Sequence, residues 1–193
     1  MLALVVVIAV IIALMRGGHL GNLSHLPLRK IGWFILAFII LIGLHLLTGK
    51  KTFLGKYGPL IHILSYVFII IGLERNWEIR EIKIISVGIF LNFLVIVLNG
   101  GRMPALINTP NLSRLSLSKL NSLADGTDPR HCLYNNSTRI GFLSDIFSLP
   151  AFIPYSVIFS IGDLIVSIGA FLLIQKVMLA QNVPHLTRRR FKR

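Results

Sequence analysis

Length, composition and charge exclude an ordinary water-soluble domain. The chain has 193 residues, of which 54% are hydrophobic and only 14% are charged, and the hydrophobic residues are gathered in blocks. The net charge of +13 lies between these blocks and in the C-terminal tail, which is typical of membrane-protein loops and does not indicate a nucleic-acid partner.

The apolar blocks predict an all-α integral membrane protein with five transmembrane helices. A helix needs about 20 mostly apolar residues to cross the hydrocarbon core, and the blocks approach that length. They form a single polytopic domain, residues 1–193, with predicted spans at residues 1–15, 31–48, 57–73, 84–98 and 154–180. The lipid bilayer is therefore the first predicted partner.

A long polar loop, residues 99–153, separates the fourth predicted span from the fifth. Within residues 111–125, four leucines recur at near-helical spacing: Leu112, Leu115, Leu120 and Leu123. This spacing predicts a short amphipathic helix that lies on the membrane surface. The loop also holds Cys132, the one cysteine of the chain, so a disulfide within the chain is excluded.

Basic residues predict the orientation of the chain in a plasma membrane. The tail, residues 181–193, ends in HLTRRRFKR, and its five lysines and arginines favour the cytoplasm. An odd number of spans then puts the N-terminus outside, which agrees with the position of Arg16 directly after the first span. The loop of residues 99–153 is consequently expected to be extracytoplasmic.

Two isolated aspartates, Asp145 and Asp163, lie at the mouth of and inside the last apolar segment. An ionised carboxylate in hydrocarbon is costly, so an acid inside a span indicates a functional site with a partner group. Pro150 and Pro154 prevent one straight helix between the two aspartates, and the chain can therefore fold back and bring them together. Two carboxyl groups at close range share a proton, which is the arrangement of an aspartic peptidase.

The turn NGGRMP after the fourth span is a second candidate site. Gly100 and Gly101 allow unusual backbone geometry, and exposed N–H groups beside Asn99 and the Arg102 cation would suit an anion, a lipid headgroup or a substrate carbonyl. The alternative is a helix C-cap with an arginine that reaches the membrane surface. Asn92 lies on nearly the same helix face as Asn99 and is a further candidate.

Other uses of the same residues stay open. Asp163 could hold a proton or a cation, or it could form structural hydrogen bonds with Asn92 or Ser160 while Asp145 caps a surface helix. The roles of three histidines are equally open, as proton relays or as hydrogen-bonding residues: His45, His62 and His131. We expect no metal and no cofactor.

Three motifs in order, NGGRMP, FLSD and FSIGD, the last followed by an apolar span, resemble a family of small bacterial membrane proteins of unknown function. The resemblance covers nearly the whole chain. It implies a membrane location and no assigned activity.

A local similarity links the chain to the lipoprotein signal peptidases, which are aspartic enzymes of the outer face of the plasma membrane. Asp145 resembles their first catalytic aspartate, and Asp163 resembles the second, which ends a Phe-Asn-x-Ala-Asp motif. Gly169 matches a glycine six residues later, and Asn99 is similar to the asparagine of their Asn-x-Gly-Ala-Ala-Phe motif. The similarity implies cleavage of a membrane-bound peptide.

The sequence also departs from those enzymes. Ser160 replaces the motif's asparagine, residues 102–104 replace Ala-Ala-Phe, and no span separates Asn99 from Asp145. The predicted function is an outward-facing aspartate-pair site resembling an aspartic membrane peptidase. The alternative is a non-enzymatic membrane protein that binds an ion, a proton or an anionic lipid headgroup through Asp163, Asn99 and Arg102.

Overall fold

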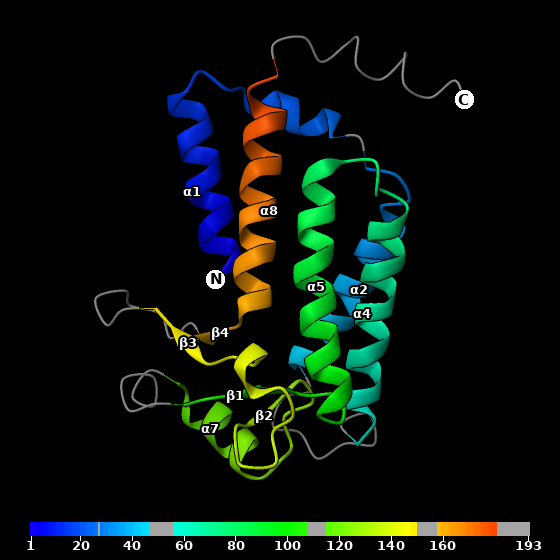
Figure 1. The fold of residues 1–193 in the computed structure, drawn as a ribbon, viewed down its shortest axis with the longest axis vertical. Coiled ribbons are helices and arrows are strands. Elements are labelled where there is room, and N and C mark those ends of the chain that lie inside the picture. Colours follow the sequence, from blue (N-terminus) through cyan, green and yellow to red (C-terminus); the bar gives the residue numbers. More distant parts are fainter. Residues whose placement is uncertain (27, 47–55, 108–114, 150–157, 181–193) are drawn as a thin grey trace.

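The structure is a computed structural model that describes residues 1–26, 28–46, 56–107, 115–149 and 158–180. The described chain is mostly helical, as predicted. Its five longest helices stand side by side (Figure 1). They are α1 (Leu2–Met15), α2 (Gly32–Leu46), α4 (Gly58–Glu74), α5 (Arg80–Leu98) and α8 (Ile161–Met178).

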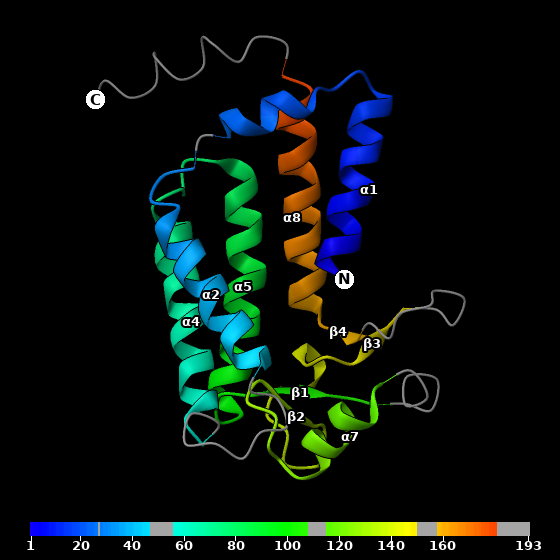
Figure 2. The same cartoon turned by 180° about the vertical axis from the view of Figure 1, so that it is seen from behind.

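The order of the helices in space differs from their order along the chain. The main helix contacts join α1 to α8, α8 to α5, α5 to α4 and α4 to α2, so α5 and α8 form the middle of the bundle. Each of these helices runs opposite to the one before it in the sequence (Figure 2). The start of α1 and the residues between α5 and α8 therefore lie toward one end, and the end of α8 lies at the other.

Glycines let the two central helices approach closely. A Cβ atom on Gly162 of α8 would lie 2.0 Å from Oδ1 of Asn92 and 2.7 Å from the carbonyl oxygen of Gly88 of α5. A Cβ atom on Gly88 would lie 2.5 Å from the carbonyl oxygen of Gly162. Small residues at such contacts are typical of helices that pack inside a bilayer.

Two helices of the described chain are long and apolar enough to cross a membrane. They are α5, with 19 residues, and α8, with 18 residues, whereas α1, α2 and α4 are apolar but shorter. Large apolar side chains face outward on all five helices, among them Val7, Phe38, Leu60, Phe90 and Ile168. A water-soluble bundle of this size would bury most such side chains, so the outer surface indicates association with a membrane.

The boundaries of α1 and α4 lie within one residue of the predicted spans, α5 begins four residues before the predicted residue 84, and the predicted end of the second span at residue 48 lies outside the described residues. α8 begins at Ile161, because Ser160 caps its first turn, whereas the sequence predicted a span from residue 154. Ile158 and Phe159 form a short strand instead, and residues 150–157 lie outside the described chain. Asp163 consequently lies in the first turn of α8, at the N-terminal end of the helix.

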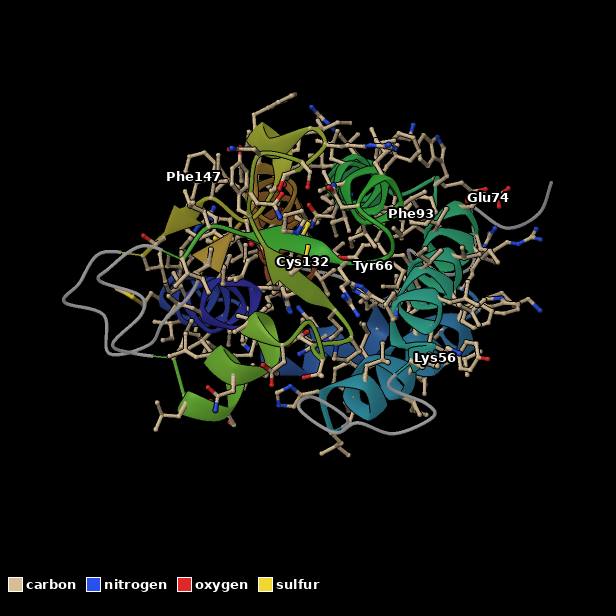
Figure 3. All side chains as sticks on the ribbon, turned by 90° about the horizontal axis from the view of Figure 1, so that it is seen from below. Lys56, Tyr66, Glu74, Phe93, Cys132 and Phe147 are labelled. Carbon is tan, nitrogen blue, oxygen red and sulfur yellow. The ribbon has the colours of Figure 1, made fainter. Side chains whose placement is uncertain are left out.

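Residues 99–107 and 115–149 fold over one end of the bundle, and we call them the cap (Figure 3). Strand β1 (Met103–Ala105) pairs in parallel with β2 (His131–Leu133), and β3 (Phe147–Ser148) pairs antiparallel with β4 (Ile158–Phe159). The cap also contains α7 (Leu117–Ala124), which lies in the segment predicted to be amphipathic, and the short helix η2 (Gly141–Leu143). The sequence predicted none of the strands.

An apolar cluster fixes the cap to the bundle. Val95 and Ile96 from the end of α5 pack with Met103 and Leu143 of the cap, and all four are buried. At the opposite end, η1 (Leu20–His25) is held by Asn22, whose Nδ2 atom donates to the carbonyl oxygens of Met178 and Ala180. The cap is therefore a packed layer in which side chains can be positioned.

Candidate functional site

Asp163 is held by hydrogen bonds on both carboxyl oxygens. Its Oδ2 accepts from the backbone N–H of Ser160 at 3.3 Å, while its own N–H donates to Ser160 Oγ at 2.9 Å, and together these form a capping box. Its Oδ1 accepts from Nδ2 of Asn92 at 2.8 Å, and Asn92 Oδ1 accepts from Ser160 Oγ at 2.8 Å. The partners of Asp163 are thus the two residues that the structural alternative named.

Asp145 differs from Asp163, because one oxygen of its buried carboxyl group has no hydrogen-bond partner among the described residues. Its backbone joins β1, since its N–H donates to the Pro104 carbonyl at 3.0 Å and its carbonyl accepts from Leu106 at 2.9 Å. The residue is only 7% exposed, and Oδ1 is buried without a hydrogen-bond partner in the described chain. Such a group costs about 1–3 kcal/mol, so it marks a candidate functional site.

The Asp145 carboxyl lines a cavity of about 160 Å³ beside α7. The other polar residues among the described lining are His131 and Lys119, and the remaining described lining residues are apolar. Nε2 of His131 lies 4.0 Å from Oδ2 of Asp145. An acid, an imidazole and an ammonium group therefore converge on one small cavity with apolar walls.

A completely buried carboxylate, Asp128, orders this group. Its Oδ1 accepts from the backbone N–H groups of Arg130 at 2.9 Å and His131 at 2.8 Å, and its Oδ2 pairs with Nζ of Lys119. Lys119 Nζ also lies 3.2 Å from Nδ1 of His131. Nδ1 therefore lies between a donor, the Lys119 ammonium, and an acceptor, Asp128 Oδ1 at 3.5 Å, while Nε2 is the ring nitrogen that faces Asp145.

Burial moves the pKa values of the acid and the imidazole in opposite directions. Burial first, and the charge of Asp163 second, raise the pKa of Asp145 to about 8. Burial lowers the pKa of His131, although Asp128 opposes this. Burial would also raise the pKa of Asp128, but the hydrogen bonds from His131 and Lys119 hold it well below its usual range. Near neutral pH, Asp145 is thus largely protonated and His131 uncharged.

The two predicted catalytic residues, Asp145 and Asp163, lie at the same end of the bundle. The charge of Asp163 acts on the pKa of Asp145, but no hydrogen bond between the two carboxyl groups is present among the described residues. Sharing of one proton by the pair therefore stays a prediction. The direct neighbour of the Asp145 carboxyl within the cavity is His131.

The turn after α5 does not offer the free amides that the sequence predicted. The N–H of Gly100 donates to the Val97 carbonyl at 3.3 Å, and that of Gly101 donates to the Ile96 carbonyl at 2.8 Å. Both glycines have positive φ, +69° and +86°. The turn is thus a helix C-cap in which both amides are used, and a binding role for Asn99, Gly100, Gly101 and Arg102 stays a prediction.

Asn99 and Arg102 take different places in this turn. Asn99 Oδ1 accepts from the Arg139 N–H at 2.9 Å and its Nδ2 donates to the Arg139 carbonyl at 3.0 Å, so the side chain fastens the cap to α5. The Nε atom of Arg102 is buried without a hydrogen-bond partner in the described chain. The Asn92 side chain donates a hydrogen bond to Asp163 and accepts one from Ser160.

The other two candidate histidines bind neighbouring groups. Nδ1 of His62 lies 2.9 Å from the carbonyl oxygen of Gly101, and Nδ1 of His45 accepts from Nη2 of Arg130 at 3.0 Å. Both histidines therefore form a hydrogen bond with a neighbouring group.

Sequence reasoning missed Lys119 and Asp128 and gave His131 little weight. A usable signal was present for Asp128. It precedes Pro129, and an aspartate that begins a turn accepts from the N–H groups two and three residues on, as Asp128 does here.

The fold and the site define a mostly helical protein with two helices suited to a membrane and a buried acid beside a histidine at one end. The chain belongs to a family of unknown function, DUF5317, whose model matches residues 25–175. It is also 25% identical to an uncharacterised protein of Thermotoga maritima over 170 residues, which cover 87% of this chain and 86% of the relative. No solved structure matches the chain.

Proposed function

We propose that this chain is a multi-pass plasma-membrane protein in which α1, α2, α4, α5 and α8 all cross the bilayer. The alternating helix directions and the outward-facing apolar side chains support this arrangement. The shorter helices fit if the bilayer thins locally or if flanking residues reach the interface. With the basic tail in the cytoplasm, the cap and its cavity lie on the outer side.

We infer that the Asp145 cavity is an acid–base site that hydrolyses a carbonyl compound. The observation that carries this proposal is the unpaired, buried Asp145 carboxyl at a cavity shared with an uncharged imidazole. A carboxylate whose pKa is near the working pH is a suitable general base, and a neutral imidazole N–H is a suitable donor to a carbonyl oxygen. The two groups supply complementary parts of one reaction.

The reaction follows from these roles. The ionised Asp145 takes a proton from a water molecule, whose oxygen attacks the carbonyl carbon of an amide or ester. The His131 Nε2–H donates a hydrogen bond to the carbonyl oxygen as negative charge develops there. The protonated Asp145 then returns its proton to the leaving nitrogen or oxygen as the bond to carbon breaks. This step uses the imidazole tautomer with its proton on Nε2, in which Nδ1 accepts from the Lys119 ammonium.

Asp163 has a supporting part in this proposal. Its charge raises the pKa of Asp145, and its hydrogen bonds hold the start of α8 beside the cap. The likeness to aspartic membrane peptidases is thereby modified, because His131 takes the role of the protonated second carboxyl group. The substrate class that this likeness suggests is a membrane-bound peptide.

The test uses the purified full-length chain in nanodiscs with a lipid-modified peptide whose cleavage is followed by mass spectrometry. Loss of the base in Asp145→Asn is expected to lower the rate about 100-fold or more. Loss of the donor in His131→Phe is expected to cost about 100-fold. Asn121→Ala, at an exposed position of α7, is the control and keeps the rate. Equal cleavage by the wild type and Asp145→Asn would refute the proposal.

A second candidate function is reversible proton binding by Asp145 without hydrolysis. The raised pKa and the small size of the cavity favour it. It predicts no cleavage by any variant, together with the pH-dependent stability that the Discussion derives for Asp145.

A further inference from the structure

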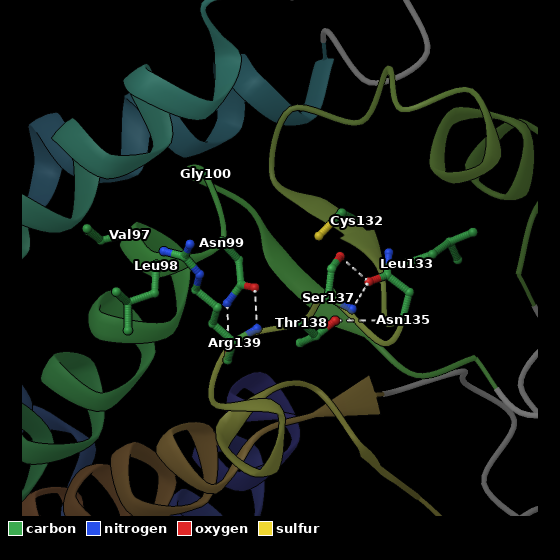
Figure 4. A pocket seen from close by; sticks show the side chains of 10 residues that line it. All are labelled: Val97, Leu98, Asn99, Gly100, Cys132, Leu133, Asn135, Ser137, Thr138 and Arg139. Atoms are coloured by element: carbon green, nitrogen blue, oxygen red, sulfur yellow. Dashed lines mark hydrogen bonds between the residues drawn. The ribbon is translucent and has the colours of Figure 1, made fainter.

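A second pocket lies where the cap meets the end of α5, and its volume is about 520 Å³. It is lined by the last residues of α5 and the following turn, by Cys132 and Leu133 of β2, and by the cap segment around Arg139 (Figure 4). Asp145 and His131 are not among the residues that line it. The pocket is therefore a separate feature from the acid–base site.

One wall of this pocket is the apolar end of a helix. Val97 and Leu98 line it, and Val97 is 41% exposed although it is an apolar residue. Leu98 is the last residue of α5, and Val97 is the residue before it. This helix is long enough to cross a bilayer. The wall thus continues the surface that α5 presents to acyl chains.

The opposite part of the pocket is polar and carries a cation. The Arg139 side chain passes Asn99 and extends toward Leu98 (Figure 4), and its guanidinium has no hydrogen bond or ion pair within the described chain. Its backbone is fixed by two hydrogen bonds with the Asn99 side chain, one accepted and one donated by Asn99. Nearby, the Asn135 side-chain oxygen accepts from Ser137, and its amide nitrogen has no hydrogen-bond partner among the residues that the structure describes.

Arg139 is the charged residue among the described residues that line the pocket, and none of those residues is acidic. Burial raises the pKa of the Cys132 thiol in the pocket wall; the charge of Arg102 opposes that rise, and the charge of Asp128, which lies outside the lining, adds to it. An anion would be favoured here, and arginine binds phosphate through two parallel hydrogen bonds.

We propose that this pocket binds the phosphate headgroup of an anionic membrane lipid, with Arg139 on the phosphate and Val97 against the first part of an acyl chain. A lipid combines both chemistries at the depth where a spanning helix ends, whereas a free phosphate ion would leave the apolar wall unused. The volume suits a headgroup, since ligand pockets measure about 300–1,000 Å³. The inference uses the proposed membrane location and is independent of the hydrolytic reaction.

Native mass spectrometry of the purified full-length chain tests this site. Phosphatidylglycerol and phosphatidylcholine with identical acyl chains are added separately, and inorganic phosphate is added as a competitor. The wild type is expected to bind phosphatidylglycerol more tightly, and Arg139→Gln is expected to weaken that binding about tenfold, which corresponds to one charge-assisted hydrogen bond. Arg139→Lys should give an intermediate affinity.

Arg75→Gln is the matched control, because it removes the same charge from an exposed position at the opposite end of the bundle. It should leave binding unchanged. Equal losses in Arg139→Gln and Arg75→Gln would overturn the proposal, since the lipid would then respond only to net charge. Displacement of the lipid by millimolar inorganic phosphate would also overturn it, because the site would then recognise the free ion. Thermal unfolding of each variant checks that the fold is retained.

Discussion

Nδ2 of Asn92 donates a hydrogen bond of 2.8 Å to Oδ1 of Asp163, and this contact ties the middle of α5 to the first turn of α8. Asn92 is 3% exposed, and its own Oδ1 accepts from Ser160. Tyr66 of α4 also interacts with the Asn92 side chain. One amide therefore connects three helices at the end of the bundle that carries the cap.

Removal of this amide should destabilise the protein without touching the cavity. In Asn92→Ala, both Asp163 and Ser160 lose a buried partner, and the expected loss is about 2–3 kcal/mol of unfolding free energy. Thermal unfolding in detergent measures it. Asn121→Ala, on the exposed side of α7, should change the stability by less than about 0.5 kcal/mol. Equal melting temperatures for Asn92→Ala and the wild type would contradict a structural role.

The close approach of α5 and α8 gives a second prediction. A methyl group in Gly162→Ala would meet Oδ1 of Asn92 at 2.0 Å and the Gly88 carbonyl oxygen at 2.7 Å, so the helices must separate. We expect a loss of about 1–3 kcal/mol or more, measured by thermal unfolding. Gly43→Ala is the control, since nothing lies within 4 Å of a Cβ atom there and alanine is the better helix former. A stable Gly162→Ala variant would exclude the tight packing.

The helices were predictable because each is a continuous apolar run, and such runs are a local property of the sequence. The ends of α1 at Met15 and of α5 at Leu98 fall where the apolar blocks end. The start of α8 was missed although a signal existed: Ser160 and Asp163 stand three residues apart, as a capping box requires. The residues just before Ser160 are mostly apolar, so the predicted span was extended through them.

The cap was not predictable in the same way. Its strands are two or three residues long, which is too short to show an alternating pattern of apolar residues in the sequence. In addition, more than twenty residues of chain separate β1 from β2, so their pairing is not a local property of the sequence. The cavity depends on this pairing, because the register of β1 and β2 brings His131 beside Asp145. The sequence therefore indicated Asp145 as a costly acid, but its neighbours follow only from the tertiary structure.

The ion pair beneath His131 gives a third prediction. In Lys119→Met the Asp128 carboxylate, which is completely buried, loses its charged partner, and this is expected to cost about 3 kcal/mol. Lys176→Met breaks a lysine–carboxylate pair whose lysine side chain is 57% exposed, so its cost should stay below about 1 kcal/mol. Thermal unfolding of both variants gives the comparison. Similar losses of unfolding free energy in the two variants would mean that the buried Lys119–Asp128 pair stabilises the fold no more than the exposed Lys176–Glu81 pair.

The buried Asp145 predicts how stability depends on pH. Its folded pKa, about 8, is above the usual value for an aspartate, so between these values the folded protein binds a proton that the unfolded chain has released. Stability must therefore fall as the pH rises toward about 8 and then level off. The lowered pKa of His131 acts in the opposite direction, but its contribution is complete above its unfolded pKa of about 6.5.

The useful window is consequently pH 7 to 8, in which Asp145 is the described group expected to dominate the change, because the Cys132 thiol, whose pKa is raised by burial, contributes only as the pH approaches its unfolded pKa of about 8.5. Asp128 is ionised in both states there, because its folded pKa is far below its usual range. Thermal unfolding of the wild type should show a decrease in melting temperature from pH 7 to about 8. Asp145→Asn has a similar shape and cannot ionise, so its melting temperature should stay nearly constant across the window. Parallel pH profiles for the two proteins would show that the carboxyl group is already ionised at neutral pH, and the acid–base role proposed for Asp145 would lose its physical basis.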